Sequence, residues 1–161
     1  MNRDERRAFV AEHRTAIFGY GRREDGPAMT VVYYVVDGDD LLVSTMAARA
    51  KAKAVARNPK VSLCVLDEKW PATYLQVYCD GKIETDHEAN VNLAMRIAGV
   101  MAGQPMPEEV RPLVAEGVIK EDRVVLRLSP YATFETPPRH VYSADDINEK
   151  LTHGLGTSLP W

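Results

Sequence analysis

A short basic segment between two apolar runs contains the residue types that could bind an anion. From Ala47 to Arg57 the chain is rich in alanine and other helix formers. Its charged residues are all cations, namely Arg49, Lys51, Lys53 and Arg57. The hydroxyls of Ser44 and Thr45 stand just before it. Hydroxyls and backbone N–H groups at a strand-to-helix turn, followed by cations, suit a phosphate ester. The segment is therefore a candidate phosphate site.

The alternative is a solvated helix face, which is the common role of such cations. Lys51 and Lys53 would lie roughly 200° apart around a regular α-helix, so no narrow stripe holds both. An irregular first turn, in which Arg49, Lys51 and Lys53 converge on one ligand, would explain the pattern better. In that case Lys51→Ala or Lys53→Ala should weaken the binding of an anionic cofactor by about 1.5 to 3 kcal/mol.

The residues before the basic segment predict the strands that position it. Ala28 to Val36 is nearly all β-branched or aromatic, which predicts a central strand buried on both faces. Turn residues at 37–40 predict a hairpin that leads into a strand from Leu41 to Thr45. The residues that this pairing would place side by side, next to the phosphate site, are Thr30, Val31, Val43 and Ser44.

The remaining pattern predicts an α+β domain made mainly of antiparallel sheet. Further strands are expected at 15–21, 60–66, 73–84 and 123–128, and further helices at 4–13, 87–101 and 108–116. Asp86 is a plausible N-cap, and Gly81 inside a strand indicates a bulge or a close backbone approach. Six antiparallel strands favour a small closed barrel, because closure removes exposed sheet edges.

Composition excludes several function classes. The chain has 161 residues, of which 45% are hydrophobic and 27% charged, as expected for one globular domain. A net charge of −3 argues against nucleic acid as the main partner. No apolar leader or membrane span is present, so a cytoplasmic protein is expected. Cys64 and Cys79 fit as buried core residues, and the dispersed histidines predict no metal site.

The ordered set of residues around the basic segment resembles a known family. STMAARAKAKAVARNPKVSL, from Ser44 to Leu63, is similar to the cofactor-phosphate segment of flavin and deazaflavin oxidoreductases with a pyridoxamine 5'-phosphate oxidase-like fold, especially the F420-dependent branch. That branch has Ser-Thr at a strand end, then Arg-x-Lys-x-Lys/Arg, then Asn-Pro or Asp-Pro, then Val/Ala-Ser-Leu. The counterparts here are Ser44, Thr45, Arg49, Lys51, Lys53, Asn58, Pro59, Val61, Ser62 and Leu63.

The resemblance extends over the order of elements from about Ala8 to Pro130. It implies one six-stranded split β-barrel, of the FMN-binding type with flanking helices, over residues 1–161, in which 132–161 form a C-terminal extension. It also implies a homodimer whose flat cofactor ring lies in a groove between the subunits. The residues that it places at the second wall of this groove are Trp70, Pro71, Ala72, Tyr74 and Gln76.

The implied activity is hydride transfer between reduced F420 and a small organic acceptor such as an enone, a quinone or a tetrapyrrole. FMN is the alternative cofactor, and a non-catalytic carrier of a flavin, deazaflavin or haem is the alternative role. Hydride transfer needs positioning and exclusion of water, so no nucleophile or metal is required. The proton could come from solvent or a tyrosine. The terminal residue Trp161 is expected to dock on the body of the protein, and whether its tail also closes over the cofactor groove is left open.

Overall fold

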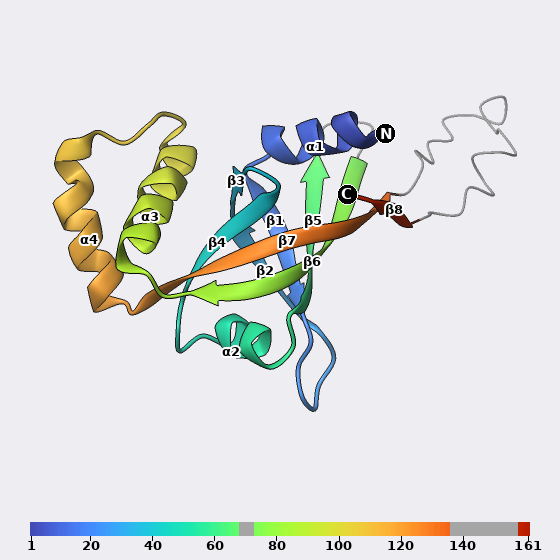
Figure 1. Cartoon of the computed structure of the whole chain (residues 1–161), viewed down its shortest axis with the longest axis horizontal. Helices are drawn as coiled ribbons and strands as arrows, with labels where there is room; N and C mark the ends of the chain where they lie inside the picture. The colour runs from blue at the N-terminus through green and yellow to red at the C-terminus, as the bar shows by residue number, and fades with distance from the viewer. Residues whose placement is uncertain (68–72, 136–157) are drawn as a thin grey trace, which may run out of the picture.

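The computed structural model describes residues 1–67, 73–135 and 158–161. Its elements follow one another along the chain as Figure 1 shows. The helices are α1 (Arg3–Glu12), α2 (Ala50–Arg57), α3 (His87–Ala102), the 3₁₀ turn η1 (Glu108–Val110) and α4 (Arg111–Lys120). The strands are β1 (Thr15–Tyr20), β2 (Ala28–Tyr33), β3 (Val35–Asp37), β4 (Asp40–Met46), β5 (Lys60–Asp67), β6 (Thr73–Glu84), β7 (Arg123–Glu135) and β8 (Ser158–Pro160).

The strands form one antiparallel sheet that curls around the core. Its order is β2-β1-β5-β6-β7-β4-β3, with β8 added beside β7. Because β2 and β3 are consecutive in the chain but stand at opposite ends of this order, the backbone between them closes the sheet. The expected α+β split barrel with flanking helices is confirmed, with eight strands in the part of the chain that the structure describes. Residues 132–135 continue β7.

Alternating side chains of the strands fill the inside of the barrel. Phe18, Leu63, Val77 and Leu126 are fully buried, each from a different strand. The outward-facing neighbours of these residues are more exposed, as period-two alternation requires. Val10 of α1 is fully buried and closes one end of this core.

The expected single strand from Ala28 to Val36 is wrong in two respects. It breaks at Tyr34, so that β2 pairs with β1 while β3 pairs with β4. The phenol of Tyr34 turns inward and donates a hydrogen bond to the Val10 carbonyl at 2.6 Å, and burial raises its pKa. The strand is also not buried on both faces, since Met29 and Val31 are 71% and 73% exposed. An apolar side chain alone does not show whether another chain segment covers it.

Helix α2 lies close against the sheet where it crosses Gly81. A Cβ atom added at Gly81 would come within 3.0 Å of Val55 Cγ1 on α2. The Gly81 N–H also donates a hydrogen bond to the Pro59 carbonyl at 2.8 Å, which confirms the close backbone approach expected at Gly81. The register shift of β6 against β7 falls nearby, between Tyr78 and Cys79.

Helices α3 and α4 form a hairpin beside the barrel (Figure 1). Asp86 caps α3 by accepting a hydrogen bond from the Ala89 N–H at 2.8 Å, as expected. Arg111 of α4 binds Glu88 and the Asn92 side chain of α3, which ties the two helices together. This hairpin becomes one side of the candidate site.

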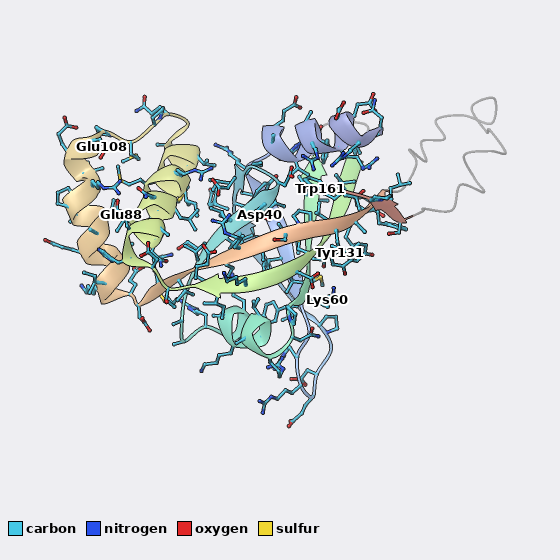
Figure 2. All side chains as sticks on the ribbon, in the orientation of Figure 1. Asp40, Lys60, Glu88, Glu108, Tyr131 and Trp161 are labelled. Carbon is cyan, nitrogen blue, oxygen red and sulfur yellow. The ribbon has the colours of Figure 1, made fainter. Side chains whose placement is uncertain are left out.

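The C-terminal residue docks on the barrel, as expected. The indole of Trp161 donates to the Asp39 carbonyl at 3.3 Å, and the Arg7 guanidinium lies 5.1 Å from the ring centroid. Figure 2 shows Trp161 below α1 and above β7. Arg6 holds the preceding strand β8 by donating to the Pro160 carbonyl at 2.7 Å.

Candidate functional site

The candidate site lies where β2 and β4 separate. Strand β2 pairs with β1, whereas β4 pairs with β7 and β3, so Thr30 and Val31 do not share the expected ladder with Val43 and Ser44. The separation nevertheless leaves Thr30 and Ser44 facing one cavity. A second cavity adjoins the first beneath α3 and α4.

The first cavity, here called the cation pocket, has a volume of about 320 Å³. Its hydroxyl-bearing residues are Tyr20, Thr30, Ser44 and Thr45, and its cations are Arg49, Lys51 and Arg123. No carboxylate lines it among the residues that the structure describes. A cavity lined by donors and cations suits a phosphate group.

The polar groups of the cation pocket are only partly paired. The buried Thr30 Oγ1 has no hydrogen-bond partner among the described residues. Lys51 is half-buried, and desolvation together with the neighbouring Arg49 charge lowers its pKa. Helix α2 starts at this pocket with Arg49 as N-cap and without a side-chain cap. A bound anion would satisfy the hydroxyl, the lysine and the N–H groups of the first helical turn together.

The second cavity, here called the chamber, has a volume of about 440 Å³ and shares Ser44, Lys51 and Arg123 with the cation pocket. Val31, Val32 and Tyr33 of β2 line one part of it. The part formed by α3 and α4, here called the helix wall, consists of Ala94, Ile97, Ala98, Met101, Val114, Gly117, Val118 and Glu121. Seven of these eight residues are uncharged.

Arg123 stands at the junction of the two cavities. Its Nη1 donates to Ser44 Oγ at 3.1 Å, and its Nε donates to the Glu121 carboxylate at 2.5 Å. It was not among the site residues predicted from the sequence. Ser44 and Arg123 are 79 residues apart, and only the register of β4 against β7 brings them together.

The predicted site residues are only partly brought together. Arg49 and Lys51 line the cation pocket, but Lys53 is exposed and lies outside it, because α2 is a regular helix from Ala50 onward. Val43 is fully buried in the core, so only its backbone could face a ligand. Gln76 pairs with Cys64 and Phe134 on β6 and lines neither cavity.

Three predicted residues, Trp70, Pro71 and Ala72, lie outside the described part of the chain. Within that part, no cluster of three or more His, Cys, Asp or Glu side chains could hold a metal ion. None of the described helices has the length and apolar character needed to span a membrane.

Comparison with known proteins identifies a family model that matches most of the chain. Residues 3–136 match the family model described as pyridoxamine 5'-phosphate oxidase. No curated protein matches the chain in sequence.

Several solved structures share the fold. A conserved hypothetical protein from Mycobacterium tuberculosis is 21% identical over 90% of this chain and 94% of its own, with a TM-score of 0.74. An F420 reductase is 20% identical over 78% of this chain and 93% of its own, with a TM-score of 0.61. The haem storage protein of Vibrio cholerae is 17% identical over 80% and 89%, with a TM-score of 0.57. At these identities the likeness establishes the fold alone.

Proposed function

Because the chain belongs to the pyridoxamine 5'-phosphate oxidase family, in which residues 3–136 match the family model, we propose that it is an oxidoreductase that uses F420. In this proposal a hydride passes between the reduced deazaflavin and a small organic acceptor. The observation that carries the proposal is the cation pocket, where Arg49, Lys51 and Arg123 meet four hydroxyl-bearing residues. Such a pocket fits the phosphate of a redox cofactor.

The chain's own residues bind and orient the cofactor in this proposal. Lys51 and Arg49 neutralise the phosphate. The Thr30 hydroxyl, which has no hydrogen-bond partner among the described residues, donates a hydrogen bond to it. Arg123 stays fixed by Glu121 and presents its guanidinium at the passage to the chamber. When bound, the deazaflavin supplies the hydride, and the chamber holds its ring away from bulk water.

F420 is proposed ahead of FMN because of the cations beyond the pocket. Lys53 and Arg57 continue along α2 on the exposed side, and the helix has no acidic residue. A cofactor with a long anionic tail would use these charges, whereas the single phosphate of FMN needs only the cation pocket. FMN therefore remains the alternative cofactor for the same site.

A homodimer is part of the proposal. The outer face of the sheet exposes Met29 and Val31 on β2, Leu66 on β5 and Tyr131 on β7, with exposed fractions from 43% to 73%. Lys60 lies beside Tyr131, with its ammonium 4.3 Å from the ring centroid (Figure 2). An apolar face of this kind is suited to contact with a second copy. The partner's copy of the segment that includes Trp70, Pro71, Ala72 and Gln76 would then complete the groove.

The alternative role is a non-catalytic carrier of a flavin, deazaflavin or haem. The observation that favours haem is the structural likeness to the haem storage protein of Vibrio cholerae. The observation against it is the lining of the two cavities, in which no described residue is histidine or cysteine.

Titration of the purified protein with F420, FMN and haemin tests these alternatives. Fluorescence of the deazaflavin and flavin, and the Soret absorbance of haem, report binding. We expect micromolar binding of F420 and oxidation of bound reduced F420 in a single turnover with an enone or a quinone. Binding of FMN without F420 would reverse the cofactor order. Binding of F420 without oxidation by any acceptor of a panel would favour the carrier.

A further inference from the structure

We propose that the helix wall is the surface that binds the hydride acceptor, and that this acceptor is flat, apolar and uncharged, as a quinone or a conjugated enone is. This inference rests on the proposed function, because it takes the cation pocket as the anchor of the redox cofactor. It adds a binding surface to that site and restricts the expected acceptors to uncharged ones.

The two helices present matched stripes to the chamber. The positions on α3 are 94, 97, 98 and 101, and those on α4 are 114, 117, 118 and 121. Both sets follow the i, i+3, i+4, i+7 spacing of one helical face. Such a face normally packs against the core of a protein. Here part of each face packs against the other helix, where Val118 is buried beside Ala94 and Val114, and the remainder lines the chamber. Met101, at the edge of the chamber, is 56% exposed. Uncovered apolar surface of this kind is stabilised by an apolar ligand.

Small residues in the stripes create the space for this ligand. Ala94 and Ala98 on α3 and Gly117 on α4 all line the chamber. A larger side chain at any of these positions would extend into the cavity. The chamber therefore depends on small side chains that a single substitution can replace.

The position of the chamber relative to the cation pocket determines where the cofactor ring and the acceptor would lie. The cavities share Ser44, Lys51 and Arg123, so a cofactor anchored by its phosphate continues past these residues into the chamber. Val31 and Tyr33 of β2 offer the ring a surface on the strand side. The helix wall then faces the ring from the α3–α4 side, and the acceptor fits between the two.

The charges around the chamber favour a neutral acceptor. Glu121 is the one charged residue of the helix wall, and Arg123 already pairs with its carboxylate. The cations Lys51 and Arg123 stand at the passage where the phosphate is held. No unpaired charge on the helix wall is left to bind a carboxylate or an amine of the acceptor. For a quinone the reaction balances, since reduced F420 loses a hydride and a proton overall and the quinone becomes the hydroquinone.

The variant Ala98→Leu tests the proposal by filling the chamber, with Ala102→Leu as its matched control. Ala102 lies one turn further along α3, is exposed and does not line the chamber. Menadione binding to protein that holds oxidised F420 is measured by calorimetry, and the KM for menadione is measured with reduced F420. We expect Ala98→Leu to weaken menadione binding and raise its KM about ten-fold or more, with the F420 dissociation constant within about two-fold of wild type. Ala102→Leu should match wild type in all three.

A second variant tests the acceptor site without changing the packing of the protein core. Met101 is exposed, so Met101→Glu places a charge at the edge of the chamber without disturbing the core. We expect weaker menadione binding here too, and a naphthoquinone sulfonate should bind wild type about ten-fold more weakly than menadione. Unchanged menadione affinity in both variants would overturn the helix wall as acceptor site. Loss of F420 affinity in Ala98→Leu would overturn it as well, by assigning the wall to the ring.

The failure of the proposed function would look different. If wild type binds no F420 at all, the proposed function is wrong, and the proposed acceptor site is wrong as well. If wild type binds F420 and oxidises its reduced form while Ala98→Leu leaves menadione binding unchanged, the acceptor site alone is wrong.

Discussion

Arg123 links the two halves of the site through a pair of side-chain contacts. One contact joins its Nη1 to Ser44 Oγ in the cation pocket, and the other joins its Nε to Glu121 of the helix wall. The planar guanidinium can make both at once, in fixed directions. In the proposed function, Arg123 would therefore set the position of the phosphate relative to the chamber.

Replacement of Arg123 should weaken cofactor binding. We expect Arg123→Ala to reduce F420 affinity by about 1.5 to 3 kcal/mol, the scale of a charge-assisted contact. Arg123→Lys should recover only part of this loss, because an ammonium group cannot keep the two directed contacts. Fluorescence titration of the three proteins measures the difference. Equal affinity of wild type and Arg123→Ala would remove Arg123 from the site.

Lys51 should lower the folding stability of the protein while it strengthens the binding of an anionic cofactor. Burial and the Arg49 charge lower its pKa in the folded protein, so the unfolded chain binds its proton more strongly. The resulting penalty on folding is present at neutral pH, and it is lost as the pH rises through the lowered pKa toward the value of an unfolded lysine.

We expect Lys51→Met to raise the free energy of unfolding of the cofactor-free protein at neutral pH. The gain should be about 0.5 kcal/mol, because solvent screens a half-buried charge. Urea unfolding at pH 7 and near pH 10 measures the difference, which should shrink at the higher pH. A variant that is less stable than wild type at neutral pH would contradict this.

The sequence reveals those site residues that are neighbours in the chain. Ser44, Thr45, Arg49 and Lys51 lie within one strand-to-helix turn, so local pattern was enough to find them. Arg123 reaches the site through strand register, which local pattern does not contain. Lys53 was expected in the same cluster, but the regular geometry of α2 directs it away from the pocket.

At the scale of elements, the sequence predicted correctly the helices and strands whose two ends are marked by local signals such as a capping residue. The strand from Thr73 to Glu84 and the Asp86-capped helix after it have the expected bounds within one residue. The segment from Ala28 to Val36 failed because its apolar residues serve two different pairings. At Tyr34 the strand leaves its first partner, and Tyr34 donates hydrogen bonds to the carbonyls of Val10 and Arg14, which are distant in the chain.

The contact of α2 with the sheet can be tested at Gly81. We expect Gly81→Ala to destabilise the protein by about 1 to 3 kcal/mol, because the added methyl meets Val55 at 3.0 Å. The start of α2 forms the cation pocket, so F420 affinity should fall with stability. Thermal unfolding and cofactor titration check both effects. Gly117→Ala on α4 is the control for the clash, since an added Cβ there meets no atom within 4 Å, and this variant should be at least as stable as wild type. Unchanged stability of Gly81→Ala would contradict the close approach.

At the scale of the whole molecule, the exposed outer face of the sheet predicts self-association. Met29 and Leu113 are both 71% exposed, but Met29 lies on the sheet and Leu113 on α4. We expect Met29→Asp to shift a dimer to monomer and to lower cofactor affinity, whereas Leu113→Asp should do neither. Sedimentation velocity and F420 titration measure the two properties. A wild-type protein that sediments as a monomer at micromolar concentration would exclude the shared groove.

The most direct test of the account is the affinity of wild type, Lys51→Ala and Lys53→Ala for F420 and for FMN, measured by calorimetry. We expect Lys51→Ala to weaken the binding of both cofactors by about 1.5 to 3 kcal/mol, because both would place a phosphate in the cation pocket. Lys53→Ala should weaken F420 alone, by at most about 1 kcal/mol, since an exposed cation contacts only the anionic tail. Arg3→Ala removes an exposed cation from α1, which lies at the top of Figure 1 while α2 lies at the bottom. This variant should change neither affinity. Cofactor binding that is unaffected by Lys51→Ala would contradict the phosphate site on which the proposed function depends.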